Sequence, residues 1–331
     1  MTGVQTCALP IYTINNFHPP ISAINSNGEN ILPKIKDLDR KFYDDFKLLP
    51  IRGYAETHNL TLKLDNKKDY KGRTLLLLTG WTDYAFSSDN VRASQSGQSL
   101  FFPYLQVKNA KGEWQTVIDS IGIPIGRPQT LTVDLTGKFL SDSREVRIVT
   151  NFRTYWDEIA VDTSEQSKNI KTYELEPEVA NLQEHGFSEE SKFGRMLVPE
   201  YKNVSFDSPW KDFAGRYTKF GDVKPLLAEI DDVFVVAKAG DEFVLKFKEL
   251  PKLPENRVYT FLLYADGYSK EMDINSGSPD AVLPLPFKGM TKYPYGANER
   301  FPMNEEKLKI YDEYTTRTVR GGVRRVELGV K

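Results

Sequence analysis

Apolar and polar residues alternate in short segments along much of this 331-residue chain, and this pattern constrains its fold most. Leu60, Leu62 and Leu64 alternate with polar residues, so one face of a strand is expected in a core and the other in solvent. The same period of two returns in four later segments, at residues 105–107, 131–135, 146–148 and 159–161. Each of these segments predicts one half-buried strand.

Two further segments complete the predicted set of strands. The apolar run from Leu75 to Leu78 stops before Gly80 and predicts a central strand that is covered on both faces. A turn at residues 109–112 leads into another expected strand at residues 114–118. The helical patterns between these segments are too short for the crossover that joins two parallel strands. Residues 53–165 are therefore predicted to form an antiparallel β-sandwich, a galactose-binding-like jelly roll.

The segment before the sandwich, residues 12–52, is predicted to be a lead-in. It contains Pro19-Pro20 and the turn-rich stretch from Asn25 to Gly28. Apolar residues at positions 35, 38, 42 and 46 follow a helical spacing, which predicts one short helix.

Residues 166–331 are predicted to form a second β-rich domain with short helices, after a polar boundary at residues 163–169. Strands are expected at residues 233–236, 243–247 and 259–264. Asp222 is expected to cap a short helix through Leu227, and Asn304 a C-terminal helix through Tyr314. The tail from Arg317 carries five basic residues and is expected to fray.

Composition excludes several classes of function. Hydrophobic residues make up 40% of the chain and charged residues 27%, as in folded globular proteins. The net charge of −2 lacks the positive excess that nucleic acids and anionic membranes attract, so no nucleic-acid partner is expected. No apolar run approaches the roughly 20 residues that a membrane-spanning helix needs.

Residues 1–11, MTGVQTCALPI, resemble the in-frame translation of a common sequencing-library adapter, as in a metagenomic fragment. The natural sequence would then begin near Tyr12, and upstream domains of the same protein would be missing. The single cysteine, Cys7, lies in this segment. The remaining residues therefore have no thiol for a disulfide, a nucleophile or a metal ligand.

Two segments are dense in aromatic and acidic residues. Residues 80–90 follow the leucine-rich strand, and residues 151–158 begin the last predicted strand of the sandwich. Aromatic rings stack on the CH faces of sugars, while carboxylates and amides bond sugar hydroxyls. The predicted ligand-binding residues are Trp81, Asp83, Tyr84, Asp89, Asn151, Tyr155, Trp156 and Asp157.

These residues also allow a purely structural interpretation. Trp81 and Trp156 would then be core aromatics. Asp83 and Asp157 would accept hydrogen bonds from buried backbone amides where strands end.

Two chemical alternatives remain open. Oxygen atoms of Asp83, Asp89 and Asn90 could hold a structural Ca²⁺ ion. Asp83, Asp157 or Asp273 could act as a general acid or base in glycoside hydrolysis. The chain contains no phosphate-binding glycine loop, no G-x-S-x-G elbow and no H-E-x-x-H helix. We therefore predict no catalytic residue, no cofactor and no metal site.

Several long segments resemble one bacterial family: LLLLTGWTDYAFSSDN, PYLQV, IGIPIGRPQTLTVDLTGKF, VRIVTNFRTYWDEIAVDT, GDVKPLL, TFLLYADGYSKEMDIN and VLPLPFKGM. They look like the C-terminal region of exported proteins that carry FG-GAP/VCBS propeller repeats and an ASPIC/UnbV domain, similar to cartilage acidic protein 1. The resemblance spans about Pro19 to Thr318 and implies an exported location and a binding or adhesive role. The D-x-D-x-D-G calcium loops of FG-GAP repeats are not found in this chain.

The function predicted from these observations is that of a non-catalytic binding or structural accessory region in a larger exported bacterial protein. Carbohydrate or a cell-surface component is the expected partner. The first alternative is a glycoside-active enzyme that uses loop carboxylates. The second is a purely structural stalk, which predicts that Trp81 and Trp156 are both buried.

Overall fold

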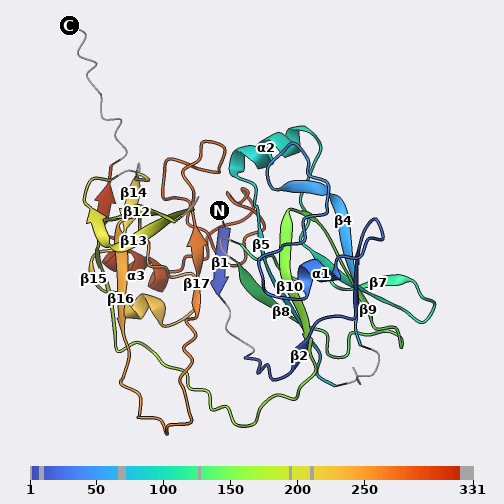
Figure 1. Cartoon of the computed structure of the whole chain (residues 1–331). Helices are drawn as coiled ribbons and strands as arrows, with labels where there is room; N and C mark the ends of the chain where they lie inside the picture. The colour runs from blue at the N-terminus through green and yellow to red at the C-terminus, as the bar shows by residue number, and fades with distance from the viewer. Residues whose placement is uncertain are drawn as a thin grey trace. The chain divides into compact units, whose positions relative to one another are not determined.

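The computed structural model describes residues 2–6, 11–65, 72–125, 128–193, 196–208 and 212–320. Of these residues 34% lie in strands and 9% in helices, so the chain is mainly β, as predicted (Figure 1). The chain divides into two compact units. Residues 11–170 form one unit, and residues 1–10 together with residues 171–331 form the other.

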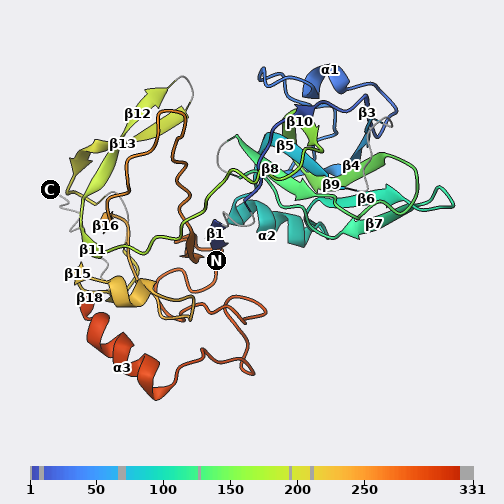
Figure 2. The ribbon, with the colours of Figure 1, turned by 90° about the horizontal axis from the view of Figure 1, so that it is seen from below.

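The unit of residues 11–170 is a β-sandwich of two antiparallel sheets, which Figure 2 shows as two layers. The four-stranded sheet has the order β2-β10-β5-β8. Its strands are β2 (Phe17–His18), β5 (Leu75–Thr82), β8 (Gln129–Asp134) and β10 (Thr154–Asp162). The five-stranded sheet has the order β3-β4-β9-β6-β7. Its strands are β3 (Ser22–Asn25), β4 (Tyr54–Lys63), β6 (Tyr104–Lys108), β7 (Trp114–Ile118) and β9 (Glu145–Phe152).

Alternation along the strands builds the core between these two sheets. Leu76 and Leu78 of β5 point into the same buried cluster as Leu62 of β4 and Ile148 of β9. Burying one such side chain stabilises the fold by about 1.5–3 kcal/mol. Leu77, which lies on the opposite face of β5, is only partly buried. The strand is therefore central in its sheet, as predicted, but less covered on its outer face than the apolar run suggested.

The strands predicted within the sandwich are confirmed, each with its ends moved by a few residues. The chain crosses between the sheets after β2, β4, β5, β7, β8 and β9, so consecutive strands often lie in different layers. The antiparallel sandwich is thus present, and one helix that periodicity did not predict, α2 (Ser87–Gln95), follows β5.

Residues 12–52 are part of the sandwich rather than a separate lead-in. β2 pairs with β10, and β3 pairs with β4. Ile31 and Ile35 belong to the buried cluster between the sheets. Pro19-Pro20 therefore connects two edge strands, and the turn from Asn25 to Gly28 follows the second of them.

The helix predicted from the spacing of residues 35, 38, 42 and 46 is wrong beyond its first position. Within residues 32–46 the structure contains only one short helix, α1 (Leu32–Ile35). Arg40 has φ +65°, a left-handed conformation that no α-helix contains. The backbone amides of Asp39 and Arg40 donate to the carboxylate of Asp157 instead, at 3.2 and 2.9 Å. Tertiary hydrogen bonds thus replace the helical ones.

The second unit contains small antiparallel sheets and short helices. A three-stranded sheet has the order β15-β11-β16, from β11 (Val179–Glu184), β15 (Gly221–Asp222) and β16 (Asp241–Lys246). Three two-stranded sheets pair β12 (Phe187–Phe193) with β13 (Met196–Ser205), β14 (Gly215–Tyr217) with β18 (Arg317–Val319), and β1 (Thr2–Thr6) with β17 (Ala265–Ser269). A small core of Ala180, Leu182, Val223 and Leu226 lies beside the three-stranded sheet.

The cap predicted at Asn304 is found, whereas the N-cap of the short helix expected after Asp222 is Val223, which makes no side-chain cap hydrogen bond. The side-chain oxygen of Asn304 accepts a hydrogen bond of 2.8 Å from the backbone amide of Lys307 at the start of α3 (Glu305–Tyr314). Asp222 accepts one of 2.9 Å from the amide of Lys224, the first residue of the 3₁₀ helix η1 (Lys224–Leu227). Local capping chemistry is short-range, which is why the sequence predicts it well.

Two strands predicted in this unit are wrong, while the one at residues 243–247 is confirmed as β16. Residues 233–236 are irregular, because the amide of Val236 donates to the side-chain hydroxyl of Thr218 and the ladder does not continue. Residues 259–264 are irregular as well, and Phe261 is 73% exposed. A strand at this place would lack the burial that makes it favourable.

The basic tail does not fray from its first residue. Arg317 lies in β18, and both terminal nitrogens of its guanidinium donate to the carboxylate of Asp241, at 3.0 and 2.5 Å. A bidentate pair of this kind is among the stronger surface contacts. The remaining basic residues of the predicted tail, apart from Arg320, lie outside the described residues.

Candidate functional site

The parts of the two chemically dense segments that lie in β5 and β10 are side by side in the four-stranded sheet (Figure 1). β5 and β10 pair antiparallel, with Trp81 opposite Tyr155. Because the neighbouring Trp156 points into the core, Tyr155 and its partner Trp81 lie on the outer face, where both are partly exposed. Their rings stack with centroids 4.6 Å apart and planes 13° from parallel.

Three rings that were not predicted as part of a site extend this stacked pair. Phe42 meets Trp81 edge-on, with centroids 6.2 Å apart. Phe46 lies 5.2 Å from Tyr155 and stacks on His58 at 4.5 Å. We call these five rings the aromatic row: Phe42, Trp81, Tyr155, Phe46 and His58. The aromatic side chains at positions 42 and 46 could have indicated this cluster, but their spacing of four residues is also typical of a helix, which is what we predicted.

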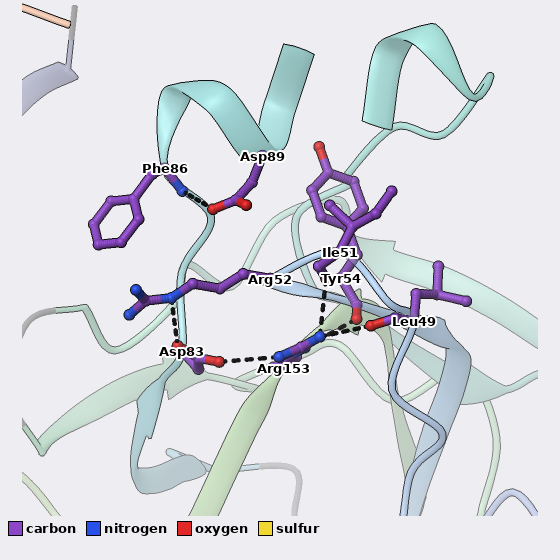
Figure 3. Close-up of polar contacts among 8 residues, drawn as sticks. All are labelled: Leu49, Ile51, Arg52, Tyr54, Asp83, Phe86, Asp89 and Arg153. Atoms are coloured by element: carbon purple, nitrogen blue, oxygen red, sulfur yellow. Dashed lines mark hydrogen bonds and ion pairs between the residues drawn. The ribbon is translucent and has the colours of Figure 1, made fainter. Parts of the chain in front are cut away.

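At the end of β5, the carboxylate of Asp83 lies between two arginines, as Figure 3 shows. One oxygen accepts from Nε of Arg52 at 3.1 Å, and the other from Nη1 of Arg153 at 3.2 Å. The backbone amide of Asp83 also donates to the carbonyl of Arg153 at 3.0 Å. Neither arginine could be predicted as a partner, because the segments that carry them are far apart in the sequence.

Arg153 has a structural role in the loop before β4. Its Nη2 donates to the carbonyls of Leu49 and Ile51, at 2.7 and 2.9 Å, and its Nε donates to the carbonyl of Tyr54 at 3.0 Å. The side chain is only 13% exposed. These contacts fix the shape of residues 49–54, from which Arg52 projects (Figure 3).

Gly53 allows this loop to approach the segment after β5. Its φ of +83° lies in the left-handed region, which favours glycine. A Cβ atom at this position would lie 2.3 Å from the backbone nitrogen of Ala85. The close contact holds the loop of Arg52 against the segment that carries Asp83, Tyr84 and Phe86.

Arg52 is the exposed member of the arginine pair. Its side chain is 46% exposed, and its guanidinium carbon lies 4.1 Å from the centre of the Phe86 ring. Tyr84 and Phe86 are 40% and 42% exposed and meet edge-on. We call this group the Arg52 surface: Arg52, Asp83, Tyr84 and Phe86.

The polar atoms of Asp89 and Asn90 are engaged in local structure. Both residues lie in α2 rather than in a loop. The carboxylate of Asp89 accepts a hydrogen bond of 2.9 Å from the backbone amide of Phe86, and the side-chain oxygen of Asn90 accepts one of 2.8 Å from the hydroxyl of Tyr54. Within the described part of the chain, no group of three or more His, Cys, Asp or Glu residues is arranged to hold a metal ion.

Trp156 and Asp157 are buried. Trp156 packs against Gly80, where an added Cβ would lie 2.9 Å from the indole ring. Asp157 is 3% exposed at a bulge in β10, and its carboxylate accepts the amides of Asp39 and Arg40. For these two residues the geometry is that of the structural interpretation.

Asn151 and Asp273 are not part of the Arg52 surface, and each makes hydrogen bonds elsewhere in the fold. The side-chain amide of Asn151 donates to the carbonyl of Ser99 at 2.8 Å and accepts from the amide of Phe101 at 3.1 Å, so it fixes the segment before β6. Asp273 belongs to the other unit, where it accepts a hydrogen bond from the amide of Asn275. The predicted ligand residues thus divide into an exposed group around Asp83 and a buried structural group.

No protein-family model and no curated protein matches this chain. Among the described residues, no helix is both long enough and apolar enough to cross a membrane. A function therefore has to be inferred from the side chains that the sandwich presents.

Proposed function

We propose that the unit of residues 11–170 is a non-catalytic carbohydrate-binding module of a larger exported bacterial protein. One observation carries this proposal: the stacked pair of Trp81 and Tyr155 and the Arg52 surface occur together at one end of the four-stranded sheet. Rings and polar groups in close proximity suit a sugar, whose CH faces and hydroxyl groups need both. Export and membership of a larger protein follow the resemblance described above.

The arrangement of the carboxylates supports binding rather than hydrolysis. Glycoside hydrolysis needs two carboxyl groups that face the same glycosidic bond. Asp157 is buried and accepts two backbone amides. Each oxygen of Asp83 accepts a hydrogen bond from an arginine. Both carboxylates thus have partners within the fold.

Exposure of the tryptophans bears on the stalk alternative. That alternative expects both to be buried, and Trp156 is, at 2% exposure. Trp81 is partly exposed, and the exposed residues Tyr84 and Phe86 follow it closely in the chain. Exposed rings grouped at one end of a module favour a ligand over a spacer.

Glycan-array screening of the full chain followed by calorimetric titration tests the proposal. Tyr84→Ala and Phe86→Ala are expected to weaken binding of the best saccharide at least about tenfold, which corresponds to about 1.4 kcal/mol. Both side chains are exposed, so the fold should be retained. Tyr173→Ala is a matched control, because Tyr173 is 55% exposed but belongs to the other unit.

Two outcomes would contradict the proposal. If no saccharide binds, or if Tyr173→Ala weakens binding as much as Tyr84→Ala, the Arg52 surface is not a sugar site. Turnover of chromogenic glycosides, abolished by Asp83→Asn, would show an enzyme instead.

A further inference from the structure

We propose that the saccharide at the Arg52 surface carries a carboxylate or sulfate group, and that the terminal nitrogens of Arg52 bind this oxyanion. The inference rests on the proposed function, because it names the ligand class for the same surface. It can nevertheless fail alone, since a neutral sugar would satisfy the proposed function equally well.

The guanidinium of Arg52 is held in place by contacts with Asp83 and Phe86. Its Nε donates to Asp83 at 3.1 Å, and its central carbon lies over the ring of Phe86, 4.1 Å from the ring centre. The terminal nitrogens point away from Asp83 (Figure 3). No hydrogen bond within the described ranges involves them. A guanidinium that is already oriented loses less conformational entropy when it binds a ligand.

Two arginine guanidiniums meet one carboxylate at the Arg52 surface. Asp83 alone faces the guanidiniums of Arg52 and Arg153, so two positive charges share one negative charge. The nearby carboxylate of Asp89 caps the amide of Phe86. Arg153 is 13% exposed and uses its other nitrogens on backbone carbonyls, so Arg52 is the member of the pair that presents its charge to solvent.

The shape of an oxyanion matches the terminal edge of a guanidinium. Two terminal guanidinium nitrogens match two oxygens of a carboxylate or sulfate, and this bidentate pairing is stronger than a hydrogen bond to a neutral hydroxyl. The rings of Tyr84 and Phe86 are exposed beside the guanidinium. A sugar ring that bears an acidic substituent would place its CH face on a ring and its oxyanion on Arg52. A neutral sugar would offer the terminal nitrogens of Arg52 no charged acceptor.

Calorimetric titration of the full chain with matched ligands tests this inference. The ligands are oligogalacturonate, its neutral methyl ester, a sulfated galactan oligosaccharide and the corresponding neutral galactan oligosaccharide. We expect at least one acidic ligand to bind at least about tenfold more tightly than its neutral counterpart in low salt, and this preference to shrink as salt is added. The two pairs distinguish carboxylate from sulfate as the preferred group.

Arg52→Gln should abolish the preference for the acidic ligand. Arg92→Gln is the matched control, because this substitution removes the same charge. Arg92 is an exposed residue of α2 whose guanidinium donates a hydrogen bond to the hydroxyl of Ser96. Arg52→Lys keeps the charge without the planar fork and should retain only part of the preference. Thermal unfolding of each variant shows whether the fold is intact.

The outcomes separate the two proposals. Equal affinity for acidic and neutral ligands, unchanged by Arg52→Gln, overturns the inference and leaves carbohydrate binding standing. A preference that survives in Arg52→Gln, or is lost equally in Arg92→Gln, also overturns it. Absence of binding to every saccharide overturns both proposals. If Arg52→Gln does not fold, wild-type affinity of Arg52→Lys for the acidic ligand contradicts the bidentate geometry.

Discussion

Asp157 shows how one buried carboxylate shapes a loop more than 100 residues away in the sequence. Its oxygen accepts the amides of Asp39 and Arg40, at sequence separations of 118 and 117. Those two donors form the turn that replaces the expected helix. A residue predicted to bind a ligand thus has a contact that only the folded chain reveals.

Replacing this carboxylate should destabilise the sandwich. Asp157→Ala leaves two backbone donors without their acceptor, and we expect the free energy of unfolding to fall by about 2–3 kcal/mol. Asp157→Asn keeps one acceptor oxygen and should cost less. Denaturant unfolding measures both, with Asp142→Ala at an exposed position as control. A loss as small as that of the control would contradict the role assigned to Asp157.

His58 should make the stability of the sandwich depend on pH. It is 7% exposed, and burial lowers its pKa below the ordinary value of 6.5. The unfolded chain therefore binds this proton more tightly than the folded protein does. The stability contributed by neutral His58 is complete above pH 6.5 and is lost as pH falls toward the lower pKa of the folded state.

The comparison with His58→Phe isolates this effect. Phenylalanine keeps a ring against Phe46, which stacks on His58 at 4.5 Å, but it does not titrate. The stability advantage of the wild type over the variant should shrink as pH falls from about 7.5 to about 5. Urea unfolding at several pH values measures this difference. A difference that does not change with pH would show that the ring titrates alike in both states.

At the scale of elements, periodicity predicted the strands of the sandwich well, but the strands of the second unit and the helices poorly. The strands of the sandwich bury one face, so their period of two appears directly in the sequence. α2 was not predicted, because only Ala93 of its residues is buried and no apolar stripe marks it. Residues 233–236 have the composition of a strand, but the backbone amide of Val236 donates to the side-chain hydroxyl of Thr218. This amide is therefore not available to a neighbouring strand.

The N-cap of α3 gives a prediction at this scale. No residue of α3 is buried, so local interactions contribute much of its stability. Asn304→Ala removes the acceptor for the amide of Lys307 and should destabilise the second unit by about 1 kcal/mol. Asn304→Asp keeps an acceptor and should have little effect. The control Asn298→Ala lies at an exposed position before the helix.

Circular dichroism during urea titration would measure the change for each of these variants. If Asn304→Ala unfolds at the same urea concentration as Asn298→Ala, the cap does not limit the stability of this unit. Loss of stability in Asn304→Asp as large as in Asn304→Ala would show that the acceptor atom is not what matters.

At the scale of the whole molecule, each unit has its own buried cluster. The cluster that contains Leu62, Leu78 and Trp156 lies entirely within residues 11–170. The smaller cluster around Leu182 and Val223 lies in the other unit. A unit with its own core can fold independently of its neighbour.

Residues 11–170 should therefore fold when expressed alone. We expect one cooperative thermal transition and the near-ultraviolet circular dichroism of packed aromatic rings. The isolated unit should also bind the saccharide that the full chain binds, since the Arg52 surface lies within it. A fragment without a cooperative transition would show that the sandwich depends on the second unit.

The sequence by itself determined the strands of the sandwich, the mainly β class and the cap at Asn304, because periodicity and capping act between residues close in the chain. Only the tertiary structure decided which chemistry meets at the end of the sheet. Asp83 meets Arg52 across 31 residues and Arg153 across 70, and no local pattern records such pairs. The tertiary structure also placed residues 12–52 inside the sandwich, because strand pairing and burial depend on partners far along the chain.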